Sequence, residues 1–236
     1  MELLFHNVKC YERIEFMNFK AVIFDLDGTL LDTLDDLADS MNIVLGRLGF
    51  PSHERAEYKI FVGDGMRKLV IRALPAQQDP GTGNLIDKAL GMMKKEYNRR
   101  CFLKTRPYEG MAGTLKKLYS GGIKLAILSN KPEAFTRKTV RRLLPRNYFS
   151  IVTGQKEGFP LKPDPAGALE ISSRLIIPPR EILYLGDTST DIITAKAAGM
   201  LPAGALWGFR TREELAGSGA AVLFQSPMEL PEYLGF

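Results

Sequence analysis

Histidine and cysteine are scarce in this sequence. Its 236 residues include two histidines, His6 and His53, and two cysteines, Cys10 and Cys101, which stand far apart. So few histidines leave almost no material for a histidine-ligated metal site or a Ser-His-Asp triad. The cysteines have no paired spacing, which argues against a disulfide framework or a zinc cluster and fits a reducing compartment. Any chemistry must therefore come from carboxylates, lysines and hydroxyls.

Long apolar runs and export signals are also missing. No apolar run reaches the roughly 18 residues that a membrane-spanning helix needs. The N-terminal segment lacks the basic head, apolar block and small-residue cleavage site of a secretory signal peptide. We therefore expect a cytoplasmic protein without a membrane partner. Residues 1–17 show no clear hydrophobic period and are expected to form an N-terminal extension, with Met17 a candidate for the biological start.

Short apolar segments alternate with longer amphipathic ones from Lys20 onward. Strands separated by helices indicate a parallel sheet with helices on both faces. We therefore expect an α/β fold with a Rossmann-like, three-layer core. The expected strands lie in residues 21–29, 123–131, 148–154, 181–187 and 203–207.

Residues 33–106 interrupt this alternation, because they contain helical patterns and no convincing strand. We expect them to form an inserted, all-helical subdomain, which leaves residues 18–32 and 107–236 for the α/β core. Open parallel sheets bind ligands beyond the carboxyl ends of their strands. Polar side chains at the strand ends are therefore the candidates for a functional site.

Two polar pairs stand at the ends of the first two expected strands. Asp25 and Asp27 are two residues apart on an extended chain, so both can project toward one site. Paired carboxylates suit a nucleophile with an acid or base, or a site for a hard cation. Ser129 and Asn130 end the second strand, where a hydroxyl and neighbouring amides can hold phosphate oxygens. Each pair alone is also explained as a turn or a helix cap.

Three more charged residues follow later strands. Lys162 stands in a Lys-Pro-Asp-Pro segment whose prolines stiffen the loop around it. Asp187 ends another strand, and Asp191 falls in the first turn of the next helix, where the helix dipole alone also favours an acid. Converging carboxylates repel one another unless a cation and Lys162 neutralise them. An all-oxygen cluster of this kind suits Mg²⁺.

Taken together, the four motifs resemble those of the haloacid dehalogenase (HAD) superfamily of phosphohydrolases. The matching segments read DLDGT, SN, KPDP and GDTSTD, and the helical insertion lies where that family has its cap. The resemblance implies a Mg²⁺-dependent phosphatase that works through an aspartyl-phosphate. It implies that Asp25 is the nucleophile and that Asp27 is the general acid and then the base. Ser129 and Lys162 would hold the phosphate.

The same resemblance implies a metal site. Asp187 would bind Mg²⁺ beside Asp25 and the backbone carbonyl of Asp27, while Asp191 would support the water shell of the metal. Positive charge from the cation and a lysine is what phosphoryl transfer requires, because charge develops on three equatorial oxygens.

Two residues help to choose a branch of the family. The dehalogenases lack the second aspartate, because a halide leaves without a proton, so Asp27 favours phosphate chemistry. Thr29 favours phosphatases over the related sugar-phosphate mutases, which often have valine there. Thr29 and Asn130 are expected to contribute to substrate binding. A sugar-phosphate mutase and a nucleotide or pyrophosphate phosphatase remain the alternatives within the family.

A glycine-rich turn in the expected cap, GDGMR, resembles the substrate loop of phosphoglycolate phosphatases. Gly63 and Gly65 would expose backbone amides to an anion, and Arg67 would pair with a substrate carboxylate. The alternative is an ordinary helix start, with Asp64 as its cap and Arg67 facing solvent. The small cap and this turn make 2-phosphoglycolate the expected substrate.

A modest excess of positive charge leaves one alternative outside enzymes. The 32 basic residues exceed the 27 acidic ones, for a formal net charge of +5. A nucleic-acid-binding module would use such charge, but no basic stretch is interleaved with aromatic residues. We therefore expect solvated helix faces and no nucleic-acid partner. The expected partner is a small phosphorylated metabolite, and the expected state is a monomer or homodimer.

Overall fold

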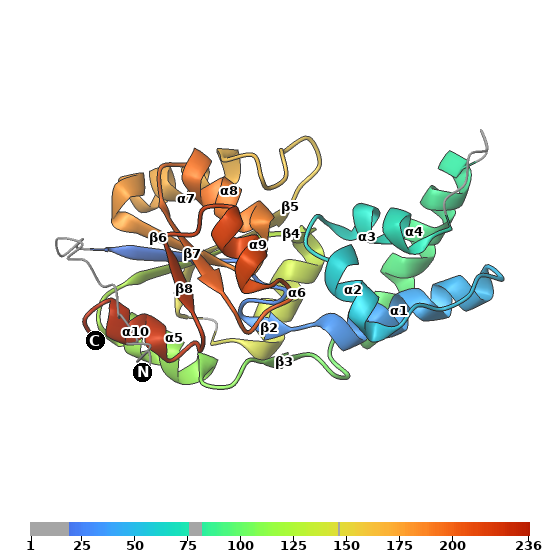
Figure 1. The fold of residues 1–236 in the computed structure, drawn as a ribbon, viewed down its shortest axis with the longest axis horizontal. Helices are drawn as coiled ribbons and strands as arrows, with labels where there is room; N and C mark the ends of the chain where they lie inside the picture. The colour runs from blue at the N-terminus through green and yellow to red at the C-terminus, as the bar shows by residue number, and fades with distance from the viewer. Residues whose placement is uncertain (1–18, 76–81, 146) are drawn as a thin grey trace, which may run out of the picture.

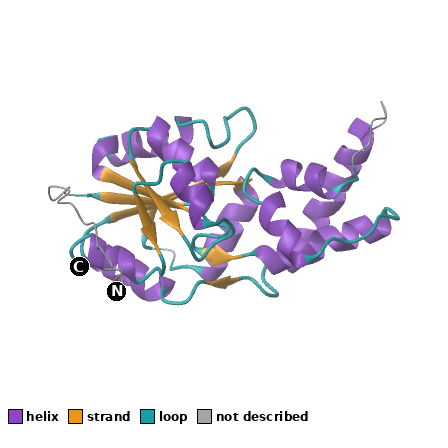
Figure 2. Ribbon diagram, in the orientation of Figure 1, coloured by secondary structure: helices purple, strands orange, loops and turns teal. Residues whose placement is uncertain are grey.

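The computed structural model describes residues 19–75, 82–145 and 147–236. The predicted N-terminal extension, residues 1–17, lies outside the described residues. Figures 1 and 2 show two parts, a sheet with helices on both sides and a helical part that extends from one end of it.

Six parallel strands form the main sheet, in the order β5-β4-β1-β6-β7-β8. Their bounds are β1 (Ala21–Phe24), β4 (Lys124–Pro132), β5 (Phe149–Gln155), β6 (Ile182–Gly186), β7 (Leu201–Ala205) and β8 (Val222–Phe224). This order reverses direction at β1, as in doubly wound sheets that bind ligands at such a point. The predicted α/β fold with a parallel sheet is confirmed. The edge strand β8 was not predicted, because its three residues are too few to show a period.

Helices cover both faces of this sheet. They are α5 (Met111–Ser120), α6 (Glu133–Leu143), α7 (Ala166–Leu175), the short 3₁₀ helix η1 (Pro179–Glu181), α8 (Ser189–Ala197), α9 (Arg212–Gly217) and α10 (Glu229–Tyr233). Successive strand residues point to opposite faces. Val22 and Phe24 accordingly pack in the core shared with α5, α6 and α10, whereas Ala21 and Ile23 pack with α7 and α8. All four side chains are fully buried, which explains why β1 reads as an unbroken apolar run.

The described residues between β1 and α5 form four helices with a core of their own. These helices are α1 (Leu34–Arg47), α2 (Arg55–Phe61), α3 (Met66–Ala73) and α4 (Thr82–Arg100). Leu34, Leu37, Met41 and Leu45 repeat at helical spacing on α1 and are buried in this core. We call the part from α1 to α4 the helical insertion.

Two short strands join the helical insertion to the sheet. β2 (Leu31–Asp32) and β3 (Arg106–Pro107) pair antiparallel, so the chain enters and leaves the insertion side by side. The buried carboxylate of Asp36 accepts hydrogen bonds from the amides of Lys104 and Thr105, which fastens the two connections together. Over the described ranges, the structure contains no helix with the length and apolar character that crossing a bilayer demands.

Candidate active site

Asp25 follows β1 directly, and the chain then turns sharply at Gly28. The φ angle of Gly28 is +93°, a region that favours glycine. A Cβ atom there would collide with the carboxylate of Asp187, which follows β6. Glycine is therefore needed at this position both for the turn and for the close approach of the two strand ends.

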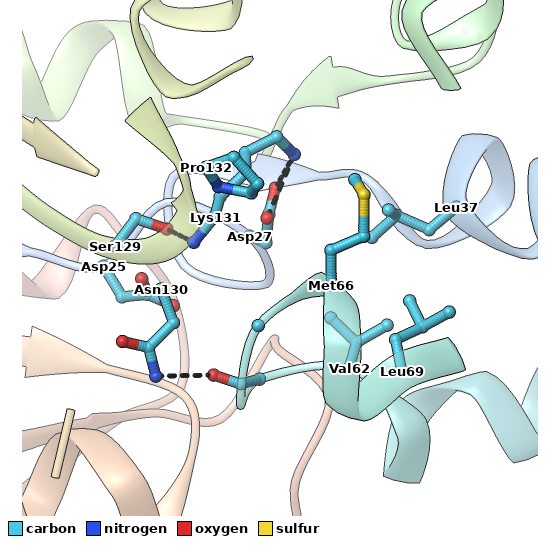
Figure 3. Close-up of a pocket in the computed structure, with 12 residues that line it drawn as sticks. Asp25, Asp27, Leu37, Val62, Met66, Leu69, Ser129, Asn130, Lys131 and Pro132 are labelled. Atoms are coloured by element: carbon cyan, nitrogen blue, oxygen red, sulfur yellow. Dashed lines mark hydrogen bonds and ion pairs between the residues drawn. The ribbon is translucent and has the colours of Figure 1, made fainter. Parts of the chain in front are cut away.

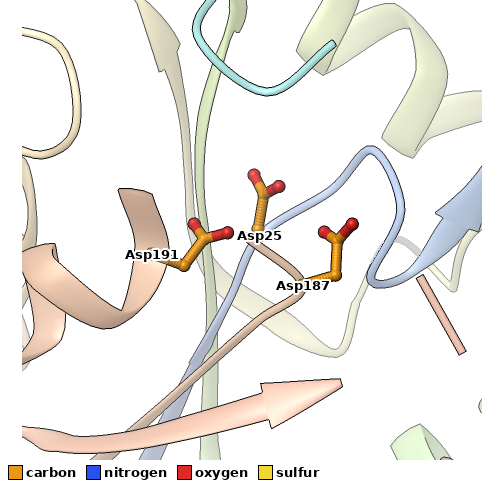
Figure 4. A group of neighbouring side chains, drawn as sticks. All are labelled: Asp25, Asp187 and Asp191. Atoms are coloured by element: carbon orange, nitrogen blue, oxygen red, sulfur yellow. The ribbon is translucent and has the colours of Figure 1, made fainter. Parts of the chain in front are cut away.

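Three buried aspartates gather beyond the carboxyl edge of the sheet. Among the described residues, Asp25, Asp187 and Asp191 each offer a carboxylate oxygen, and these atoms lie within 4.8 Å of one another. Figure 4 shows the three side chains pointing toward a common space. Nζ of Lys162 lies 2.7 Å from an oxygen of Asp25 and 2.7 Å from an oxygen of Asp191. One ammonium group thus contacts two of the three carboxylates.

This imbalance of charge alters the acidity of the cluster. Burial raises the pKa of Asp25 to about 7, and Asp191 adds to the rise while Lys162 opposes it. Burial, followed by the charges of Asp25 and Asp191, also raises the pKa of Asp187 well above its ordinary value. The carboxylates therefore lack positive charge around them. An all-oxygen donor set with this deficit fits a hard divalent cation.

Neighbouring groups hold two of these carboxylates in place. The hydroxyl of Thr29 donates to one oxygen of Asp187 at 2.9 Å, and the amide of Phe209 donates to the other at 2.9 Å. The amide and hydroxyl of Thr188 both donate to Asp191 in a capping box at the start of α8. The hydroxyl of Thr29 thus contacts Asp187, and the expected role of Thr29 in substrate binding stays a prediction.

A pocket lies between the sheet and the helical insertion. The core side of the pocket is lined by Asp25, Asp27, Ser129, Asn130, Lys131 and Pro132. The insertion contributes Leu37, Val62, Gly63, Gly65, Met66 and Leu69. Figure 3 shows the polar side chains of the core on one side and the apolar side chains of the insertion on the other. The structure therefore brings Gly63 and Gly65 to the same pocket as Asp25.

The loop before α3 touches the core directly. Nδ2 of Asn130 donates to the carbonyl of Gly63 at 3.2 Å, and Oδ1 of Asn130 accepts from the amide of Lys162 at 2.9 Å. Gly65 has a φ of +91°, and a Cβ atom there would lie 3.2 Å from the carbonyl oxygen of Asn130. The side chain of Asn130 thus fixes the backbone on both sides of the pocket.

Arg67 lies outside the pocket. Its guanidinium is 2.5 Å from the carboxylate of Asp87 on α4, and both side chains are more than half exposed. The alternative interpretation placed Arg67 in solvent, as found, but was wrong to make Asp64 the cap of α3. The residue preceding that helix is Gly65, without a side-chain cap, and Asp64 contacts Arg72 and Thr190 instead.

Lys131 is the site residue that the sequence interpretation missed. Its Nζ lies 2.7 and 3.0 Å from the two carboxylate oxygens of Asp27 and 2.7 Å from the hydroxyl of Tyr97. Burial lowers the pKa of Lys131, but the charges of Asp27 and Tyr97 outweigh this and raise it above its ordinary value. Strand alternation carried a signal, because Lys131 stands two residues after Ser129 on β4.

The fold and this site define a class of protein. Buried aspartates at the carboxyl edge of a doubly wound sheet, under a helical insertion, characterise an α/β enzyme with a capped active site. The haloacid dehalogenase-like hydrolase family matches residues 22–205, and the chain belongs to this family. Membership confirms the resemblance drawn from the four motifs.

Individual relatives within the family give a more specific comparison. The chain is 37% identical over 181 residues to a phosphoglycolate phosphatase of Nitrosospira multiformis, covering 76% of this chain and 80% of the relative. It is 33% identical over 222 residues to a phosphoglycolate phosphatase of Psychrobacter arcticus, covering 92% and 96%. The crystal structure of a predicted phosphoglycolate phosphatase from Haemophilus somnus is similar with a TM-score of 0.84 and 25% identity, covering 91% of this chain and 97% of that one.

Proposed function

We propose that this protein is a Mg²⁺-dependent phosphatase that hydrolyses a small phosphate monoester through an aspartyl-phosphate, with 2-phosphoglycolate as its substrate. The observation that carries the proposal is the position of Asp25. Its buried carboxylate lines the pocket, pairs with Lys162 and lies within 4.8 Å of two further carboxylates. Asp27 lines the same pocket beside it.

In the first proposed step, a carboxylate oxygen of Asp25 attacks phosphorus and the bond from phosphorus to the leaving oxygen breaks. The carboxyl group of Asp27 donates its proton to that oxygen, so the product leaves as an alcohol. In the second step, water attacks the phosphorus of the aspartyl-phosphate. Asp27 accepts a proton from this water, and phosphate leaves as the Asp25 carboxylate is restored.

The remaining residues hold the phosphate and the cation. Asp25, Asp187 and the backbone carbonyl of Asp27 would hold Mg²⁺, with Asp191 supporting its water shell. When bound, the cation supplies positive charge to the transferring phosphoryl group. Ser129 lines the pocket and is placed to bind a phosphate oxygen.

The choice of substrate rests on the relatives and on the pocket. Relatives at 30–37% identity are named phosphoglycolate phosphatases. We propose that residues 33–106 act as a cap over a core of residues 18–32 and 107–236. We also propose that Gly63 and Gly65 take part in substrate binding. The exposed position of Arg67 gives no support to the expected pairing with a substrate carboxylate.

A cytoplasmic location belongs to the same proposal and is supported by the buried, unpaired thiol of Cys101. The expected monomer or homodimer and the expected lack of a nucleic-acid partner stay predictions.

Phosphate release from a panel of small phosphate monoesters tests this function. We expect the highest kcat/KM with 2-phosphoglycolate, loss of activity with EDTA and recovery with Mg²⁺. Asp25→Asn should lower kcat at least about 10³-fold without unfolding the protein, because the amide is a poor nucleophile. Asp87→Asn, which changes an exposed aspartate of the insertion, is the control and should stay active.

Metal-independent activity, or an active Asp25→Asn variant, would contradict the mechanism. A panel without preference for 2-phosphoglycolate would contradict the substrate alone.

A further inference from the structure

The ammonium group of Lys131 has three hydrogen-bond donors and three short contacts. It meets both oxygens of Asp27, at 2.7 and 3.0 Å, and the hydroxyl of Tyr97, at 2.7 Å. The side chain of Lys131 is 3% exposed, and Tyr97 is fully buried. A lysine ammonium donates three hydrogen bonds, so its capacity is filled by these two residues.

These contacts connect the two parts of the molecule. Asp27 follows β1 and Lys131 lies in β4, both in the core, whereas Tyr97 lies on α4 of the helical insertion. The ring of Tyr97 packs edge-on against Phe135 of α6, with centroids 5.4 Å apart, and Lys131 Nζ lies 4.7 Å from the Tyr97 ring centroid. The phenol is therefore held by core residues on two sides. Its contact with Lys131 depends on the insertion lying against the core.

We propose that Lys131 and Tyr97 are positioning residues that orient Asp27 for proton transfer when the helical insertion closes on the core. The inference rests on the proposed function, in which Asp27 is the acid. Lys131 faces both oxygens of the carboxylate and so limits its rotation. Tyr97 in turn fixes the ammonium, and this second contact exists only in the closed arrangement.

The proton balance needs no further reactant. Asp27 gives its proton to the leaving oxygen as the bond from that oxygen to phosphorus breaks, and becomes a carboxylate. Lys131 keeps its three hydrogens and stabilises the new negative charge. In the second step the same carboxylate takes a proton from the attacking water. The two positioning residues transfer no proton themselves.

Leaving groups of different acidity separate this role from a merely structural one. An alkyl phosphate needs a proton on its leaving oxygen, whereas p-nitrophenolate leaves without one. The constant kcat/KM reports the steps up to the first bond cleavage, so it isolates the step in which Asp27 is the acid. It is measured for both substrates at saturating Mg²⁺ and one pH.

With an alkyl phosphate, Lys131→Met should lower kcat/KM about 100-fold and Tyr97→Phe about fivefold. With p-nitrophenyl phosphate both variants should stay within about threefold of the wild type. Lys131→Arg keeps the positive charge and should recover part of the loss. Lys138→Met is the matched control, because Lys138 of α6 contacts Asn98, which lies on α4 like Tyr97, but has no contact with Asp27. Any loss in this variant should therefore be equal for the two substrates. Thermal unfolding verifies that each variant is folded.

Equal losses with both substrates would overturn the proposal, as would wild-type values in Lys131→Met. A rise in KM confined to carboxylate-bearing substrates would overturn it too and assign Lys131 to substrate binding. Asp27→Asn separates this failure from that of the proposed function. If Asp27→Asn does not lower kcat/KM more for the alkyl phosphate than for p-nitrophenyl phosphate, the acid role of Asp27 itself is wrong.

Discussion

The hydroxyl of Thr190, in the first turn of α8, donates a 2.9 Å hydrogen bond to the carboxylate of Asp64 in the loop before α3. A core helix thus binds the helical insertion at the edge of the pocket. Arg210 adds a second connection, because its guanidinium donates to the carbonyl of Val62 at 2.9 Å. Closure of the pocket is therefore supported by polar contacts as well as by apolar packing.

Thr190→Val should weaken this closure, since it removes the hydroxyl and keeps the shape of the side chain. One hydrogen bond contributes about 1 kcal/mol, so we expect KM to rise about fivefold with little change in kcat. Thr194→Val is the control, because that hydroxyl donates to the carbonyl of Thr190 within α8. Similar kinetic changes in both variants would show that the contact with Asp64 does not act on closure.

Gly65→Ala should disturb the loop that touches the core. An alanine would have a φ of +91° and a Cβ atom 3.2 Å from the carbonyl of Asn130, so we expect a loss of about 1–2 kcal/mol in the closed loop. Steady-state kinetics should show this as a higher KM. Gly91→Ala, in the middle of α4 with open space around it, should instead stabilise the protein by roughly 0.5–1 kcal/mol in urea unfolding. Unchanged kinetics in Gly65→Ala would contradict a close approach of the Gly65 loop to Asn130 during catalysis.

Arg67→Ala should leave kcat/KM for 2-phosphoglycolate within about twofold of the wild type. Arg67 pairs with Asp87 on the outer surface of the insertion, and exposed ion pairs contribute about 0–1 kcal/mol. Kinetics and thermal unfolding of the variant test both statements. A tenfold rise in KM would contradict this expectation and would indicate that Arg67 contacts the substrate.

Stabilisation by Mg²⁺ should depend on pH through Asp25. The folded protein raises the pKa of this carboxyl from 3.8 to about 7 through burial. Protonation of Asp25 therefore contributes to the stability of the metal-free fold. This contribution is complete below pH 3.8 and is lost as the pH rises toward 7. Because a cation must displace the proton, Mg²⁺ should raise Tm more at pH 8 than at pH 5.5.

Thermal unfolding with and without Mg²⁺ at both pH values measures this effect. Asp25→Asn should make the rise in Tm caused by Mg²⁺ more similar at the two pH values. An equal rise in Tm at pH 5.5 and pH 8, in the wild type, would contradict a site that includes the Asp25 carboxylate.

The strand ends were predictable because their signals are local. Asp25 and Asp187 directly follow buried apolar runs, and parallel strands bring their carboxyl ends to one edge. The short strand β8 gave no such signal. Its pairing with β7 depends on the position of the rest of the sheet.

The orientation of the helical insertion was beyond local reasoning. Met66 lines the pocket and Arg67 does not, although they are neighbours, because successive helix residues point about 100° apart. Which of them faces the core depends on how α3 packs. Lys131 escaped notice for a similar reason, since its partner Tyr97 lies 34 residues away on another part of the fold.

The paired strands β2 and β3 have a consequence for how the protein can move and change. A body attached along one edge by a two-stranded ribbon can swing, but it cannot slide across the sheet or detach from it. Because the chain leaves the insertion beside the point where it entered, a different set of helices could occupy this place without rethreading the sheet. The aspartates at the edge of the sheet would stay in place, and only the leaving group that the protein accepts would change.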